Sequence, residues 1–254
     1  MKFSRNQLCF FIFIFSFILY GNTIRNGYGY DDEYAVNNNA QVEQGVSAIP
    51  EIFSSYYTAG SDTKGQYAYR PVAKASFAIE HSLFGKNPHI SHFVNILIYA
   101  FLGMLIFNMF SRWLKNYTLV FPLLITLLFL AHPVHTEVVA SLKNREVLFS
   151  FIGGMLMLYF TGQYLGQNRS IYLLWAVLSG LFAVFSKPDC VPFLGILFLI
   201  SWYFTNASLK KTAATVLLLS FFMAGTYFLI YTQLAIAEPG IFRKKVFHCF
   251  QVLN

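Results

Sequence analysis

Long apolar blocks alternate with short polar segments along most of this chain. After an apolar run at residues 8–20 and a polar stretch to about residue 89, hydrophobic blocks fill the ranges 90–110, 117–131, 147–164, 171–185, 191–204 and 212–233. The blocks lack the polar face of an amphipathic helix, and several approach the roughly 20 residues that a helix needs to cross a bilayer. The pattern predicts an all-α integral membrane protein with about seven transmembrane helices.

The same pattern divides the chain into four parts. We predict a first transmembrane helix at 1–25, a long extracytoplasmic loop at 26–89, a six-helix transmembrane bundle at 90–235 and a tail at 236–254. The run at 8–20 is also close to the length of a signal-peptide core. However, Gly21, Asn22 and Thr23 after it do not form a small-residue cleavage site, which favours a retained helix. We expect the chain to be a fragment of a longer protein or to end in a diverged tail.

Composition and charge agree with a membrane location. Hydrophobic residues make up 56% of the chain and charged residues 11%, against about 25% charged in soluble domains. The net charge of +7 fits basic loop ends that orient membrane helices, so we expect no nucleic acid partner. The scattered cysteines and the short N-x-S/T matches at Asn116, Asn168 and Asn206 add little.

The distribution of charge predicts an orientation. If the amino terminus is inside, the inner connections carry cations and no carboxylate, and these cations are Arg112, Lys115, Arg169, Lys210 and Lys211. All Asp and Glu residues then fall outside, together with further cations that include the basic cluster at 243–245. The membrane would be a bacterial inner membrane or, in a eukaryotic cell, the endoplasmic reticulum, with the functional face extracytoplasmic.

A pair of acids follows the first apolar run. Asp31 and Asp32 are adjacent, so one of them could act as a base while the other orients a partner or a metal ion. The alternative is a solvated acidic turn. Polar and ionisable residues at the helix ends of a membrane bundle are functional-site candidates, and this pair lies only a few residues beyond a predicted span.

Cations on the same predicted side would suit an anionic ligand. They are Arg70, Lys143, Arg145 and Lys187. The planar fork of an arginine matches a phosphate group, although any one of these residues alone would also suit a lipid headgroup. Taken with the acids, they predict a site in which a phosphate leaving group lies beside a base.

His132, His135 and Glu137 form an H-x-x-H-x-E pattern after the third apolar block. Two histidines and a carboxylate can bind zinc, but a helix places positions i and i+3 on one face and turns i+5 away. We therefore expect no metal at these residues, while a divalent cation stays open as a cofactor of the site. The other interpretations are the start of an interfacial helix and a polar wall that holds an anionic ligand.

At these residues the sequence resembles the GT-C-type membrane glycosyltransferases related to the transmembrane O-mannosyltransferases that carry tetratricopeptide repeats. It resembles the protein O-mannosyltransferases more distantly. The likeness covers about residues 28–193. It consists of five ordered blocks: Tyr30-Asp31-Asp32 with Asn37 to Asn39; Tyr69-Arg70-Pro71, leading to Phe84-Gly85, Asn87-Pro88, His92 and Val94-Asn95; His132 to Glu137 with Val139-Ala140; Lys143 to Glu146; and Ser186-Lys187.

The resemblance implies a GT-C-like amino-terminal module that moves a sugar, with inversion, from a polyprenyl or dolichyl phosphate donor to an acceptor hydroxyl on the outer side. Asp31 or Asp32 would be the catalytic carboxylate, and the remaining candidates would bind the donor phosphate or the substrate. The acceptor is open among a protein, a glycolipid and a surface polysaccharide. Relatives usually place an acid directly after the lysine of the last block, whereas here Pro188 separates Lys187 from Asp189.

Two other classes of function compete with an enzyme. A non-catalytic membrane protein could bind polyprenyl phosphate or assist assembly with the same residues. A transporter is disfavoured, because the charges fall at helix ends on one side and not at the membrane midplane.

Overall fold

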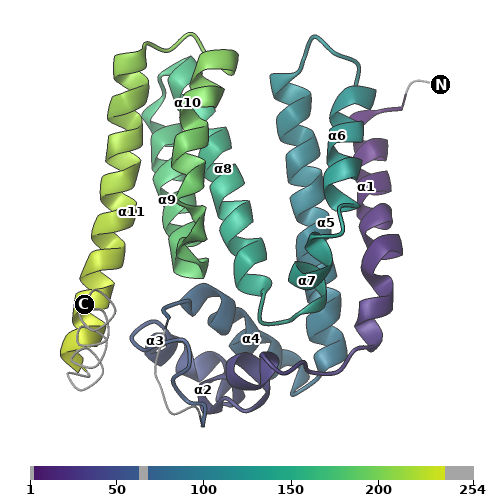
Figure 1. Cartoon of the computed structure of the whole chain (residues 1–254), viewed down its shortest axis with the longest axis vertical. Coiled ribbons are helices and arrows are strands. Elements are labelled where there is room, and N and C mark those ends of the chain that lie inside the picture. The colour runs from purple at the N-terminus through teal and green to yellow at the C-terminus, as the bar shows by residue number, and fades with distance from the viewer. Residues whose placement is uncertain (1–2, 63–67, 238–254) are drawn as a thin grey trace, which may run out of the picture.

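The computed structural model describes residues 3–62 and 68–237, and within these ranges the chain is helical and contains no β-strand. Long helices run roughly side by side, and the short helices of the first polar segment lie across one end of them (Figure 1). Lys64, the basic cluster at 243–245 and nearly all of the predicted tail lie outside the described residues. The elements are α1 (Arg5–Tyr20), η1 (Gly21–Arg25), η2 (Glu33–Asn37), α2 (Ala40–Glu43), η3 (Gly45–Ala48), α3 (Ile49–Ile52), α4 (Pro71–Phe84), α5 (Pro88–Trp113), α6 (Val120–Leu130), α7 (His135–Ala140), α8 (Arg145–Gln167), α9 (Ser170–Ser186), η4 (Pro188–Cys190), α10 (Pro192–Phe204) and α11 (Leu209–Ala237).

Four of these helices are long and apolar enough to cross a membrane. They are α1 continued by η1 (Arg5–Arg25), α5, α8 and the part of α11 at Leu209–Thr232. Three further apolar helices are shorter, at Val120–Leu130, Ser170–Ser186 and Pro188–Phe204. The 11 residues of α6 rise about 16 Å, well short of a hydrocarbon core of about 30 Å. The all-α membrane architecture is therefore supported, and the count of seven spans stays a prediction.

Successive long helices alternate in direction, so their connections fall at two opposite ends (Figure 1). One end carries the turns between α5 and α6, between α8 and α9 and between α10 and α11. The other end, which we call the cap end, carries the described residues of 26–87, the connection through α7 and the connection through η4. Every candidate site residue of the sequence belongs to one of these three cap-end segments or to the first turn of α8.

The segment at 26–89 is more ordered than a loop. Its described residues fold into short helical turns and the 14-residue helix α4, which begins with Pro71 at its first position and stops at Gly85. Gly85 has φ of 68°, in the left-handed region that favours glycine. The face of α4 that includes Ala73, Phe77 and Ala78 is buried against the rest of the segment. The extracytoplasmic location of this segment stays a prediction.

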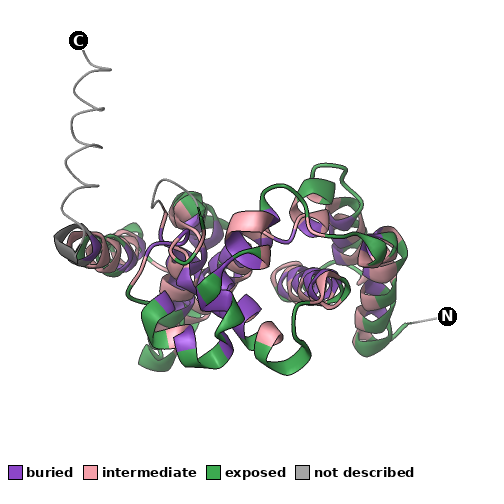
Figure 2. Cartoon of the chain, turned by 90° about the horizontal axis from the view of Figure 1, so that it is seen from below, coloured by how far each residue is buried: buried purple, intermediate pink, exposed green. Residues whose placement is uncertain are grey.

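The bundle is closely packed around α8 and α9. A Cβ atom added at Gly153 would lie 2.8 Å from the Cβ of Ala183, and one added at Gly154 would lie 2.7 Å from the ring of Phe193. Small residues at such crossings let helix backbones approach within a membrane. Buried residues gather near the middle of the molecule, and the helices at its edges keep exposed faces (Figure 2). The apolar window of α11 is only 17% buried, against 50% for α5.

Candidate functional site

The two adjacent acids have different environments. The side chain of Asp32 is buried, and its two oxygens accept hydrogen bonds from the backbone N–H of Gly29 at 2.7 Å and of Lys143 at 2.8 Å. Asp31 is exposed, and its carboxylate has no hydrogen-bond or ion-pair partner among the described residues. Asp32 therefore holds the turn at residues 29–32 against the connection before α8. The carboxylate of Asp31 is accessible to a ligand.

Three cations converge on one carboxylate at the start of α8. The fully buried Glu146 pairs through Oε1 with Nη1 of Arg70, and the ammonium groups of Lys143 and Lys187 lie 3.9 and 4.0 Å from the same oxygen. The ammonium of Lys187 also lies 2.7 Å from the carboxylate of Asp189, and the side chain of Asp189 is 63% exposed. We call Arg70, Lys143, Lys187 and Glu146 the cation cluster. Lys143 links it to the acids, because its backbone N–H binds Asp32.

Several polar atoms of this region are buried without a partner. They include the hydroxyl of Tyr57, Nε of Arg70 and Oε2 of Glu146, all without a hydrogen bond in the described structure. Arg70 lies 5.6 Å from the centre of the Tyr57 ring. Unpaired buried polar atoms in a native structure call for a missing water or ligand. Their convergence marks the cation cluster as a place where a polar group could bind.

Burial and the charge of Glu146 shift the pKa values of Arg70 and Tyr57. Burial disfavours the charged form of Arg70, but the hydrogen bond and the negative charge of Glu146 outweigh this effect and raise the pKa of Arg70. Burial, followed by the charge of Glu146, raises the pKa of Tyr57 well above its usual value. At neutral pH Arg70 is therefore a guanidinium, and the neighbouring Tyr57 is a neutral phenol.

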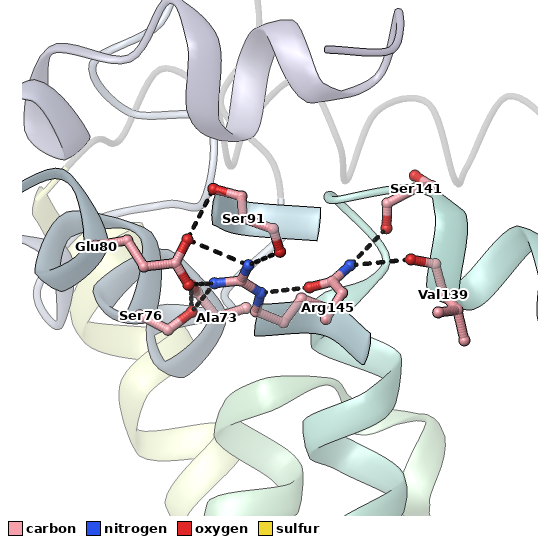
Figure 3. Close-up of polar contacts among 8 residues, drawn as sticks. Ala73, Ser76, Glu80, Ser91, Val139, Ser141 and Arg145 are labelled. Atoms are coloured by element: carbon pink, nitrogen blue, oxygen red, sulfur yellow. Dashed lines mark hydrogen bonds and ion pairs between the residues drawn. The ribbon is translucent and has the colours of Figure 1, made fainter. Parts of the chain in front are cut away.

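Arg145 belongs to a different network. Its guanidinium donates to Glu80, to the hydroxyl of Ser76, to the carbonyl of Ser91 at 2.9 Å and to Oδ1 of Asn95 at 2.7 Å. Figure 3 shows this guanidinium between α4, the start of α5 and the connection before α8. The side chain is fully buried, and all three of its nitrogens are occupied. Arg145 thus ties the cap to the bundle, and no donor of Arg145 is left for a phosphate group.

The histidine pattern lies at the wall of the bundle. α7 begins at His135, whose half-buried ring packs 4.3 Å from that of Phe129. Burial, with His132 nearby, lowers the pKa of His135. His132 and Glu137 are exposed, and the two histidine rings are 6.1 Å apart. Among the described residues, no three His, Cys, Asp or Glu side chains are grouped so that they could hold a metal ion.

An apolar groove runs between the two halves of the bundle and ends close to these residues. It has a volume of about 420 Å³ and is lined by α5, α6, α8 and α10 without polar surface. Phe129, which contacts His135, and Phe151 line it. Ser150, next to Phe151 in the chain, donates a hydrogen bond of 2.8 Å to the carbonyl of Lys187. Phe151 follows Glu146 by five residues in α8, which is about 7.5 Å along the helix axis.

Several proteins of known name are similar to this chain in sequence. The chain is 33% identical to mouse protein O-mannosyl-transferase TMTC1 over 133 residues, which are 51% of this chain and 14% of that protein. It is 30% identical to human protein O-mannosyl-transferase TMTC1 over 159 residues, 61% of this chain and 17% of that protein. It is 27% identical to mouse protein O-mannosyl-transferase TMTC4 over 205 residues, 71% of this chain and 27% of that protein. The chain is related to the TMTC O-mannosyl-transferases.

This relationship confirms the family resemblance of the sequence blocks. The chain spans between 14% and 27% of the length of these three TMTC proteins. No family model matches the chain, and no solved structure matches it.

Some residues in and around this candidate site were not among the sequence candidates. Glu146 is the centre of the cation cluster, yet in the sequence it is only the last letter of the Lys143 block. Tyr57 lies in a polar stretch without any motif. Lys74 is buried beneath α2, where its ammonium donates to Gln41 and, at 2.5 Å, to the carbonyl of Ala59. A glutamate directly after a basic pair at the start of an apolar helix was the one available signal, because such a buried acid needs a cationic partner.

Proposed function

We propose that this chain forms the donor-binding part of a membrane glycosyltransferase that moves mannose from a polyprenyl or dolichyl phosphate to an acceptor hydroxyl. The observation that carries the proposal is the convergence of Arg70, Lys143 and Lys187 on one buried carboxylate. An apolar groove supports it, because the groove reaches Phe151, five residues along α8 from that carboxylate. The lipid tail would occupy the groove and the phosphate would meet the cations. Mannose as the sugar, and a protein as the acceptor, follow from the names of the relatives.

The exposed carboxylate of Asp31 is the proposed base. The acceptor oxygen attacks the anomeric carbon of the sugar, the bond from that carbon to the phosphate oxygen breaks, and its electron pair stays on the phosphate. The acceptor proton passes to Asp31. Cations aimed at the leaving oxygen stabilise the charge that develops on it. Asp32 and Glu146 already have partners, so a single displacement assisted by Asp31 would invert the sugar configuration.

The active face is proposed to be extracytoplasmic. The end of the bundle opposite the cap carries Arg112, Lys115, Arg169, Lys210 and Lys211 at or beside its turns and no Asp or Glu. Cytoplasmic connections are enriched in Lys and Arg, which would leave the cap end outside. The relatives are animal proteins, which favours the endoplasmic reticulum over a bacterial inner membrane.

A transfer assay tests the proposal. Membranes containing the chain would be given dolichyl phosphate carrying labelled mannose, together with a protein acceptor. We expect label on the acceptor, and we expect Lys187→Gln to reduce its rate of appearance by about tenfold or more, since a charged contact to phosphate would be lost. Donor binding without any transfer would favour the binding-only alternative. Neither binding nor transfer would overturn the proposal.

A further inference from the structure

Glu146 has an unusual position for an acid in an anion-binding site. Its carboxylate is fully buried, one oxygen is shared by three cations, and the other oxygen has no hydrogen bond among the described residues. A buried charge with an unpaired oxygen is costly to keep. It also carries the same sign as the proposed phosphate ligand, so it must weaken binding of that ligand.

The two lipid phosphates of the proposed reaction differ in charge. A glycosylated polyprenyl phosphate is a diester with one negative charge, and the lipid phosphate that leaves is a monoester with about −1.5 to −2 at neutral pH. Cations around the phosphate therefore bind the product more tightly than the donor. The same preference stabilises the transition state, but it slows the release of the product.

We propose that Glu146 sets the strength of the anion site, because its negative charge partly offsets the charges of Arg70, Lys143 and Lys187 and so lets the lipid phosphate product leave. This inference rests on the proposed function and assigns Glu146 as a positioning residue. Other nearby acids are less suited to the role. Asp189 is 63% exposed, so water and salt screen its charge, and Asp32 is held by two backbone N–H groups.

Glu146→Gln is the direct test. Glutamine has the same size, and its amide oxygen can still accept a hydrogen bond from Arg70, so the change removes mainly the charge. The matched control is Glu43→Gln, because Glu43 lies at the surface, 3.8 Å from Lys86, outside the cluster. The probes are dolichyl phosphate and mannosylated dolichyl phosphate, offered to the purified chain in lipid nanodiscs.

We expect Glu146→Gln to bind dolichyl phosphate about tenfold tighter, to bind the donor tighter by a smaller factor, and to lower both kcat and KM. Glu43→Gln should match the wild-type protein. Equal or weaker binding of dolichyl phosphate by Glu146→Gln would overturn the inference. Competition by inorganic phosphate at the same concentrations would count against the lipid donor of the proposed function, since the site would then take a free anion without its lipid.

A compensating pair separates charge from folding. Lys187→Gln should weaken binding of dolichyl phosphate, and the double variant with Glu146→Gln should return it close to the wild-type value. A misfolded Glu146→Gln protein would not be rescued in this way, and failure of the double variant to recover would contradict the inference. If the wild-type chain binds neither lipid, the proposed function fails first. If it binds both and only the variants disagree, the inference alone fails.

Discussion

Substitution of the two acids in turn separates catalysis from folding. Asp31 is exposed and without a partner in the described structure, so Asp31→Asn should change the free energy of unfolding by no more than about 0.5 kcal/mol. The amide cannot take up a proton, however. If Asp31 is the base, the transfer rate should fall by about 10² to 10⁴-fold, with donor affinity unchanged.

Asp32→Asn should have the opposite profile. Both carboxylate oxygens accept backbone hydrogen bonds, at 2.7 and 2.8 Å, and an asparagine has only one oxygen to offer. Its amide nitrogen would face the backbone N–H of Gly29 or Lys143, donor against donor. Losing a charged hydrogen bond in a buried site costs about 1.5 to 3 kcal/mol, so this variant should unfold more easily and lose activity in proportion to the folded fraction.

The assay measures both quantities on the same preparations. Transfer of labelled mannose in membranes gives the rate, and thermal unfolding in detergent gives the stability, with Glu43→Gln as a control for loss of an exposed acid. A normal rate in Asp31→Asn, together with a large loss of rate in a stably folded Asp32→Asn protein, would make Asp32 the base. Near-normal rates in both would refute a base in this pair and would leave the binding-only account.

Three further outcomes are expected. Arg70→Lys should weaken donor binding by about 10 to 100-fold in a titration, because an ammonium cannot both pair with Glu146 and lie against Tyr57 as the planar guanidinium does; unchanged affinity would argue against a phosphate contact. The three native sequons lie at the end opposite the cap end, so they should stay unmodified in microsomes. A new sequon made by Phe53→Asn lies at the cap end and should be glycosylated. The reverse pattern of gel shifts would invert the proposed orientation. Burial lowers the pKa of Lys74 to about 7 in the folded protein, whereas the unfolded side chain has a pKa of about 10.4. Between these two pH values the unfolded state binds more protons, so the free energy of unfolding should rise with pH. Thermal unfolding in detergent from pH 6.5 to 9 should display this rise, and an equally steep rise in Lys74→Met would assign it to other groups.

Much of the fold follows from the hydrophobic pattern. The apolar blocks lie in helices, because a backbone segment in lipid must satisfy its own hydrogen bonds. At one end of the bundle the connections carry Lys and Arg without Asp or Glu. Helix lengths were less predictable. The block at 117–131 forms a helix of only 11 residues, at Val120–Leu130. Residues 117–119 belong to the turn that follows α5, and residue 131 already belongs to the connection to α7.

The sequence predicts which charged residues gather at the candidate site, but it does not predict which of them form ion pairs with one another. The sequence places Asp31, Arg70, Lys143 and Lys187 on one side, and all four lie at the cap end. It does not distinguish Arg145 from the other cations. Only the fold buries Arg145 against Glu80, 65 positions away, and this pairing excludes it from the ligand. A motif that lists residue types cannot tell a ligand-binding cation from a buried structural one, since both require the same side chain.

The site is assembled by contacts between distant segments, and this has a consequence for how it fails. Asp32 reaches Lys143 across 111 positions, Arg70 reaches Glu146 across 76, and Arg145 reaches Glu80 across 65. The first tie sets the distance from the base to the cations, the second brings the cap cation to the bundle, and the third holds α4 against α5 and α8. Breaking the third tie leaves Asp31 and the cation cluster chemically intact but lets them move apart. Because a displacement of about 1 Å can cost 10²-fold in rate, a variant at Glu80 would resemble a catalytic mutant in turnover while still binding the lipid donor.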